Sequence, residues 1–363
     1  MLDWLRGLMR SIDKSVQFFS KKINGIVAPH LNLVRFNFPT ELEFEPIQLC
    51  NAKCFCCPYT NLSNSPEYTK KRMSREQIEH LLVSFHENLL KNNYHGPTTV
   101  NPFRYSDPLI SPDLDFILDF ASRSNLKIQI TTNARGLNSR TIPILERNLK
   151  ALKKNIFISV LGSSEEEIQK NMQISLEYTK KRICELSAQK SPLIPRILIS
   201  LRKISNTAEE SLRLEALKQD FMSWGVHAQI KSGWLHNRIE GLEIPQAPGH
   251  FVVACKLYRN KLLRRLEVMV NGDVVLCDDD AEGRRIFGNV FQQSIDKIWN
   301  GKLKDEHLQI YSTIYSDKKS NLLCANCSRA SYARDYQLLD TVREIGVGNF
   351  LKQIKSKNYI LLE

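Results

Sequence analysis

Three cysteines in the first part of the chain have the spacing of ligands for an iron-sulfur cluster. Cys50, Cys54 and Cys57 stand at C-x3-C-x2-C, just after an apolar stretch that is typical of a strand. Three thiolates can hold three corners of a cubic cluster and leave the fourth iron open for a ligand that is not protein. An open position also separates catalytic from closed structural zinc sites. The spacing therefore indicates a reactive metal centre, and a zinc knuckle or a set of buried thiols is the alternative.

Composition places these cysteines in a folded chain and a reducing compartment. The sequence has 363 residues, of which 42% are hydrophobic, which is enough for one large domain and a smaller one. Nine cysteines occur without an export signal before them, so metal ligation in the cytoplasm is favoured over disulfides. The net charge of +12 indicates an acidic partner or a solvated surface. The basic residues are not interleaved with aromatic ones as in a nucleic-acid-binding groove, so no specific nucleic-acid partner is expected.

The N-terminal segment is amphipathic rather than membrane-spanning. Charged residues such as Arg6, Arg10 and Lys14 interrupt its apolar pattern, which excludes a secretory signal or a membrane span. Its apolar residues lie on one helical face. The helix could dock on the main domain or make peripheral contact with an anionic membrane.

Apolar runs and longer amphipathic segments alternate from about residue 43 to 232, which predicts βα units around a parallel sheet. The expected strands are 43–49, 98–104, 126–132, 155–161, 196–202 and 227–231. The expected helices are 74–92, 112–123, 140–153, 164–188 and 207–223. Six such units predict a partial (β/α)6 TIM-like barrel. The cysteine run follows the first strand, at the end of the barrel where active sites gather.

The pattern changes after about residue 250. Two apolar runs flank Asn271-Gly272, which predicts a hairpin with a two-residue turn that ends near Cys277. A helix near 293–300 and the pair Cys324-x2-Cys327 follow. This region is expected to be a small α+β domain organised by metal.

The cysteine run, with Asn51, Ala52 and Lys53 in its first gap and Pro58 after it, resembles the signature of radical S-adenosylmethionine (SAM) enzymes. The resemblance implies a 4Fe-4S cluster on Cys50, Cys54 and Cys57, with SAM on the open iron. The reduced cluster would cleave SAM to a 5'-deoxyadenosyl radical. Cys56 would present its backbone to the adenine, where an aromatic residue or methionine is commoner, so Cys56 could also replace Cys57 as ligand.

Other segments resemble the SAM-binding motifs of the same superfamily. Ser106-Asp107-Pro108-Leu109 is similar to its Gly-Glu-Pro-Leu segment, and Asp107 would accept hydrogen bonds from the SAM ammonium. Thr131-Thr132-Asn133-Ala134 is similar to its Thr-Asn-Gly segment. Ser159 would bind the ribose or the carboxylate of SAM, and Arg202 would pair with that carboxylate. The alternatives are a turn or helix start at Asp107-Pro108, a helix cap at Ser159 and a solvent-exposed side chain for Arg202.

The C-terminal cysteines resemble the auxiliary-cluster regions called SPASM and Twitch, to which Gly288-Asn289-Val290 and Ile298-Trp299 are also similar. The resemblance implies a second 4Fe-4S cluster, with a structural zinc site as the alternative; its ligands would be Cys255, Cys277, Cys324 and Cys327. Full thiolate ligation implies an electron relay. Cys184 lies outside both sets, either as a buried residue or as a hydrogen-atom donor.

The resemblance thus implies a radical SAM enzyme that abstracts hydrogen from an unactivated carbon, in peptide or natural-product maturation. Dehydrogenation of a cyclitol or sugar is the alternative, and a non-catalytic module stabilised by a cluster or zinc belongs to another class. The implied partners are a peptide or small-molecule substrate and an electron donor such as flavodoxin or ferredoxin. The expected parts are a helical extension, the barrel, the auxiliary domain and a helical tail, at 1–40, 41–240, 250–335 and 336–363.

Overall fold

The computed structural model describes residues 33–66, 70–205, 207–231, 254–255, 264–278, 280–315, 330–331 and 359–362. Of the N-terminal extension predicted over 1–40, positions 1–32 lie outside these residues. Cys324 and Cys327 also lie outside them. Most of the predicted helical tail also lies outside them. Within the described part, no helix is long and apolar enough to cross a membrane.

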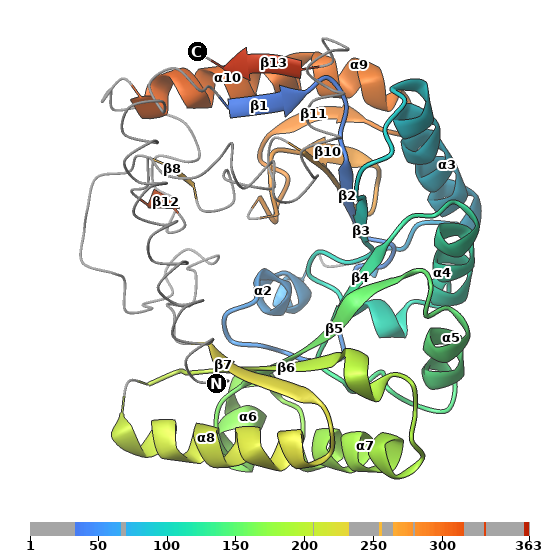
Figure 1. Cartoon of the computed structure of the whole chain (residues 1–363). Helices are drawn as coiled ribbons and strands as arrows, with labels where there is room; N and C mark the ends of the chain where they lie inside the picture. The colour runs from blue at the N-terminus through green and yellow to red at the C-terminus, as the bar shows by residue number, and fades with distance from the viewer. Residues whose placement is uncertain are drawn as a thin grey trace, which may run out of the picture.

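A curved nine-stranded sheet forms the centre of the molecule, with the strand order β11-β10-β9-β2-β3-β4-β5-β6-β7 (Figure 1). Strands β2 to β7 run parallel to one another. These six are β2 (Glu41–Phe44), β3 (Thr99–Asn101), β4 (Ile128–Thr132), β5 (Leu152–Leu161), β6 (Ile197–Arg202) and β7 (His227–Lys231). Each overlaps one of the strands predicted from the sequence. The prediction of a partial (β/α)6 barrel is confirmed.

Helices cover the outer, convex face of this sheet, and the short helix α2 (Pro58–Asn64) lies on its concave side (Figure 1). Figure 1 shows α3, α4 and α5 along one flank and α6, α7 and α8 along the other. Their bounds are α3 (Arg75–Lys91), α4 (Leu114–Arg123), α5 (Thr141–Arg147), α6 (Glu165–Met172), α7 (Leu176–Ala188) and α8 (Ala208–Ser223). The side chains of Ser74 and Ser164 cap α3 and α6, at the positions where the helices predicted over 74–92 and 164–188 begin.

The single helix expected over 164–188 is wrong. Gln173 ends α6 in the left-handed conformation, with φ of 54°, and the Ser175 side chain then caps α7. The break turns the chain between two apolar faces that both pack on the barrel. The sequence analysis also missed α2 and α10 (Lys302–Tyr315).

The C-terminal hairpin consists of β9 (Arg265–Val268) and β10 (Asp273–Val275), which pair antiparallel. Its loop is longer than the predicted two-residue turn. The Gly272 amide donates to the Met269 carbonyl and the Met269 amide to Asp273, so three residues form the connection. Gly272, with φ of 87°, occupies its left-handed position. The helix expected near 293–300 is present as α9 (Ile295–Asn300), and β11 (Ile286–Asn289) extends the sheet beyond β10.

Strand β9 pairs in parallel with β2, so the hairpin continues the main sheet. Two short antiparallel pairs lie outside that sheet, β1 (Leu33–Phe36) with β13 (Tyr359–Leu362) and β8 (Ala254–Cys255) with β12 (Ala330–Ser331). The second pair sets Cys255 opposite Ala330, three residues after Cys327.

A buried ionic network joins β2 to β9. In the register of the sheet, Glu43 of β2 lies opposite Glu267 of β9 on one side and Asn101 of β3 on the other. Arg265 Nη1 lies 2.6 Å from Glu43 Oε2 and 3.4 Å from Glu267 Oε1. Its Nη2 lies 3.3 Å from Glu41 Oε2. The Arg265 guanidinium therefore forms ion pairs with three carboxylates.

Glu45, just after β2, is buried, and this burial raises its pKa to about 7 despite the nearby charge of Arg104. Between the ordinary pKa of a glutamate and pH 7, Glu45 keeps its proton in the native state and loses it in the unfolded state. The free energy of unfolding therefore falls as the pH rises toward 7. Glu45→Gln cannot ionise and should raise the free energy of unfolding by about 3 kcal/mol at pH 8. Denaturant unfolding at pH 8 and pH 4.5 measures this. A gain of equal size at both pH values would contradict the expectation.

Candidate functional site

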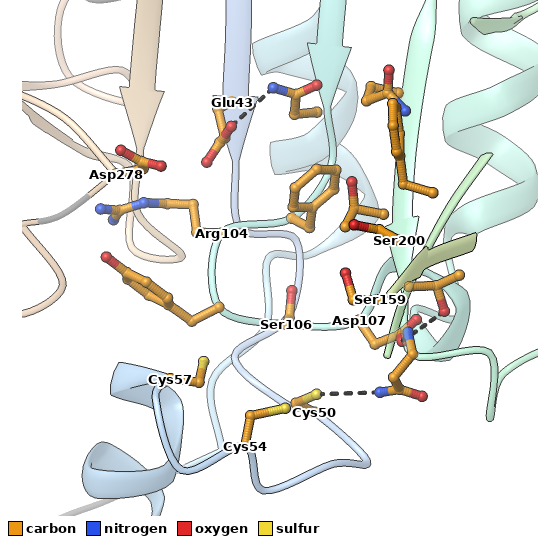
Figure 2. Close-up of a pocket in the computed structure, with 18 of the residues that line it drawn as sticks. Glu43, Cys50, Cys54, Cys57, Arg104, Ser106, Asp107, Ser159, Ser200 and Asp278 are labelled. Atoms are coloured by element: carbon orange, nitrogen blue, oxygen red, sulfur yellow. Dashed lines mark hydrogen bonds between the residues drawn. The ribbon is translucent and has the colours of Figure 1, made fainter. Parts of the chain in front are cut away.

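The cysteine run forms a loop at the carboxyl end of β2, and α2 begins directly after it (Figure 2). Cys57 stands at the N-cap position of α2, and its amide donates to the Cys54 carbonyl at 3.0 Å. The Thr60 hydroxyl donates to the same carbonyl at 2.7 Å. Pro58 occupies the first turn of the helix, where no amide hydrogen is needed. Local bonds therefore fix Cys54 and Cys57 relative to each other.

The end of α6 and the segment after β4 hold the rest of the loop. The amides of Lys53 and Phe55 donate to the carbonyls of Met172 and Asn171 at the end of α6, each at 2.9 Å. The Arg135 guanidinium donates to the Asn51 carbonyl at 2.8 Å. Attachment to the loops after β4 and β5 keeps the cysteines at the mouth of the barrel.

Asn133, at the end of β4, faces the first cysteine. Its Nδ2 donates to Asn51 Oδ1 at 2.7 Å and lies 3.7 Å from Cys50 Sγ, as the dashed line in Figure 2 marks. Burial raises the pKa of the Cys50 thiol to about 12, and the charge of Asp107 adds to this. Burial raises the pKa of Cys54 as well. Deprotonation of these thiols thus calls for a cation beside them, which iron supplies.

Asp107 is buried between the ends of β3 and β4. Its Oδ1 accepts from the Leu109 amide at 3.0 Å, and its Oδ2 accepts from Thr132 Oγ1 at 2.7 Å and from the Asn133 amide at 2.9 Å. Burial raises the pKa of Asp107, and these hydrogen bonds oppose that effect. A carboxylate has about four acceptor sites, so one remains for a ligand. Asp107 therefore connects Ser106–Leu109 with Thr131–Ala134, the two segments that resemble SAM-binding motifs.

A cavity of about 790 Å³ lies between this loop and the inner face of the sheet. All the predicted SAM-contact residues line it: Cys56, Asp107, Ser159 and Arg202. Ser159 lies on β5 opposite Ser200 of β6, and both point toward the cavity in Figure 2. The predicted site residues of the barrel therefore converge on one space, as strand order predicts.

The predicted auxiliary ligands are only partly described. Cys277 follows β10 and packs, partly buried, against the hydrophobic core. Arg104 Nη2 donates to the Cys277 carbonyl at 3.3 Å and to the Asp280 carbonyl at 3.0 Å. Arg104 thereby links the end of β3 to the Cys277 loop. Cys255 is placed by its backbone in β8.

Cys184 lies exposed on α7 and is absent from the residues that line the cavity. This placement does not support a role as hydrogen-atom donor to a substrate in the barrel. The sequence analysis missed three residues that shape the site, namely Glu43, Asn101 and Arg135. An acidic residue inside a buried strand was the one signal that could have indicated Glu43.

Within the described residues, no three His, Cys, Asp or Glu side chains meet as ligands of a single metal ion. A cubic cluster places each cysteine on a different iron atom, so its ligands stand farther apart than those of one zinc ion. The soft thiolate donors of Cys50, Cys54 and Cys57 suit iron in such a cluster. The loop therefore fits a cluster with three protein ligands.

Residues 255–328 match the family model of SPASM, an iron-sulfur cluster-binding domain. This match spans all four predicted auxiliary cysteines. No curated protein matches the chain in sequence.

Solved structures share the fold at low sequence identity. BtrN in complex with AdoMet and 2-DOIA is 15% identical, with a TM-score of 0.52 over 82% of this chain and 97% of BtrN. Streptococcus suis SuiB bound to precursor peptide SuiA is 15% identical, with a TM-score of 0.51 over 85% of this chain and 74% of SuiB. Native anSMEcpe with bound AdoMet and Cp18Cys peptide is 14% identical, with a TM-score of 0.54 over 88% and 98% of the two chains.

Proposed function

We propose that this chain, which has the radical SAM fold and a C-terminal SPASM domain, is an enzyme that cleaves SAM reductively and abstracts hydrogen from an unactivated carbon. One observation carries the proposal. The three-cysteine loop, which would leave one iron of a cubic cluster without a protein ligand, lies at the carboxyl end of the first barrel strand and borders a cavity of about 790 Å³. A cavity of this size can hold SAM and part of a substrate.

The residues of the chain have distinct proposed roles. Cys50, Cys54 and Cys57 would each bind one iron, and Asn133 would orient Cys50 through its hydrogen bond. The Cys56 backbone, Asp107, Ser159 and Arg202 would contact SAM.

When bound, the cluster and SAM supply a 5'-deoxyadenosyl radical that can remove a hydrogen atom from a C–H bond. The walls of the barrel would exclude water and other hydrogen donors from this radical. A second cluster on Cys255, Cys277, Cys324 and Cys327 would take up or pass on an electron. A flavodoxin or ferredoxin in the cytoplasm would supply electrons to the first cluster.

For the substrate, we propose a peptide or natural product undergoing maturation. The structures of SuiB with SuiA and of anSMEcpe with Cp18Cys peptide support this class, since both proteins share the fold. The second candidate is dehydrogenation of a small cyclitol or sugar. The polar wall of the cavity at β2 and β3, which includes Glu41, Glu43, Thr99 and Asn101, favours it, because such a wall suits a compact polar molecule.

The activity is tested by reconstituting the protein with iron and sulfide under nitrogen and adding dithionite and SAM. Formation of 5'-deoxyadenosine is the expected result. Tight zinc binding without cluster absorbance and without this product would instead support a non-catalytic module. Perdeuterated peptides and perdeuterated sugars or cyclitols then separate the two substrate classes, because deuterium should enter 5'-deoxyadenosine only from the class that reacts.

A further inference from the structure

The cavity wall formed by β2 and β3 has a hydrogen-bond acceptor that no described protein group uses. Asn101 is 4% exposed, and its Nδ2 donates to Glu43 Oε2 at 2.9 Å. Its Oδ1 is buried and has no hydrogen-bond partner among the described residues. Both side chains line the cavity, and Figure 2 shows Glu43 at the end remote from Cys50, Cys54 and Cys57. Because an unpaired buried acceptor costs about 1–3 kcal/mol, this wall is suited to a ligand that donates hydrogen bonds.

A second acceptor lies between this wall and the cysteines. The Ser106 hydroxyl oxygen is buried without a hydrogen-bond partner in the described part of the chain, and the residue also lines the cavity. Figure 2 places Ser106 between Arg104 and the cysteine loop. Polar atoms therefore continue from Glu43 and Asn101 toward the proposed SAM site.

The charged side chains of this wall that line the cavity balance: Glu41, Glu43 and Asp278 against Arg104, Arg264 and Arg265. Two further buried carboxyls, Glu45 beside Arg104 and Glu267 beside Glu43, do not line it, and burial raises the pKa of both. A cation bound at this wall would favour the ionised form of such carboxyls over the protonated form. Burial raises the pKa of Glu43, and the charge of Asp278 adds to the increase while Arg265 opposes it. A bound cation would stabilise the ionised Glu43. The opposite side of the cavity, near β5 to β7, is lined instead by Lys153, Arg202 and Lys231.

We propose that Asn101 and Glu43 form a subsite for a primary ammonium group of the substrate, with Asn101 Oδ1 and the Glu43 carboxylate as the acceptors. The inference rests on the proposed function and narrows its substrate class. Such an ammonium group occurs in an aminosugar or aminocyclitol and in a lysine side chain of a peptide. The two sources share the chemistry that this wall recognises and differ in what surrounds it.

Binding to the SAM-loaded protein with both clusters, measured by calorimetry under nitrogen, tests the subsite. One pair of probes is glucosamine and glucose. The other is a capped tripeptide with a central lysine and the same peptide with norleucine. In one pair, the ammonium probe should bind about tenfold more tightly than its neutral partner, as one charge-assisted hydrogen bond provides. The pair that shows the preference identifies the source.

Asn101→Leu and Glu43→Gln should each remove most of this preference, whereas Glu209→Gln on the exposed face of α8 should retain it. Circular dichroism and iron content establish that each variant is folded and loaded, and Asn101→Leu leaves the carboxylate pairs of Arg265 in place. Equal affinity within both pairs for the unmodified protein overturns the proposal, as does a full preference in both variants. Formation of 5'-deoxyadenosine in the same preparations tests the proposed function separately, because it does not depend on which probe binds.

Discussion

Replacing Cys54 with alanine is expected to abolish formation of 5'-deoxyadenosine from SAM and dithionite. Cys54 is half-buried in the loop, and its carbonyl accepts from both Cys57 and Thr60. Loss of one of three thiolates leaves too few protein ligands for a cluster with a single open iron. The measurement is product formation by chromatography after anaerobic reconstitution, together with iron and sulfide per chain. About one cluster of the two should be lost.

Two further cysteine variants serve as controls for this result. Cys184→Ala should retain the product, because Cys184 is exposed on α7 and lies away from the cavity. Cys56→Ala should also retain the cluster if Cys57 is the third ligand. Loss of the cluster in Cys56→Ala, with retention in Cys57→Ala, would reverse the assignment of these two neighbours.

Asp107→Ala is expected to give the second large effect, on both stability and SAM binding. The side chain accepts hydrogen bonds from Leu109, Thr132 and Asn133, and all three donors would lose their partner. Unpaired buried donors cost about 1–3 kcal/mol each, so we expect a loss of about 3–5 kcal/mol. Asn133 would also lose its fixed position beside Cys50. Denaturant unfolding and equilibrium binding of SAM to the reconstituted protein measure the two effects.

Asp119→Ala provides the matched control on the following helix. Asp119 is exposed and pairs with Arg123 across one turn of α4. Such a surface pair contributes at most about 1 kcal/mol. A loss in Asp107→Ala no larger than the loss in Asp119→Ala would show that the buried network does not organise the site.

The sequence predicts the barrel well, because its strands are apolar runs between helices with clear cap residues. Ser74 and Ser164 mark helix starts through side-chain bonds to nearby amides, which are local and therefore visible in sequence. The break at Gln173 was missed because a helix that ends in the left-handed conformation usually does so at glycine or asparagine, and glutamine gives no such signal. Helix α2 was missed because it is short and begins at Pro58, directly after the cysteine run, which was interpreted only as a loop of metal ligands.

Two parts of the candidate site were predictable from the sequence: the cysteine triad from its spacing, and Asp107, Ser159 and Arg202 from their places near the ends of parallel strands. The cysteine triad depends on a short loop, so its signature lies in consecutive residues. The ammonium subsite depends instead on the register between strands: Glu43 and Asn101 are 58 positions apart and become neighbours because β2 pairs with β3. The role of Asp107 in joining two strand ends likewise emerges only from the folded sheet.

The parallel pairing of β9 with β2 bears on how this protein could be dissected. A barrel fragment that ends near residue 240 would expose β2 as a bare edge, with backbone donors and acceptors open to another chain. The same cut would remove Arg265 and leave the Glu43 carboxylate without its cation. The first barrel strand is thus completed by β9, so the described part of the C-terminal region extends the barrel sheet and a cut between them would leave that sheet unfinished.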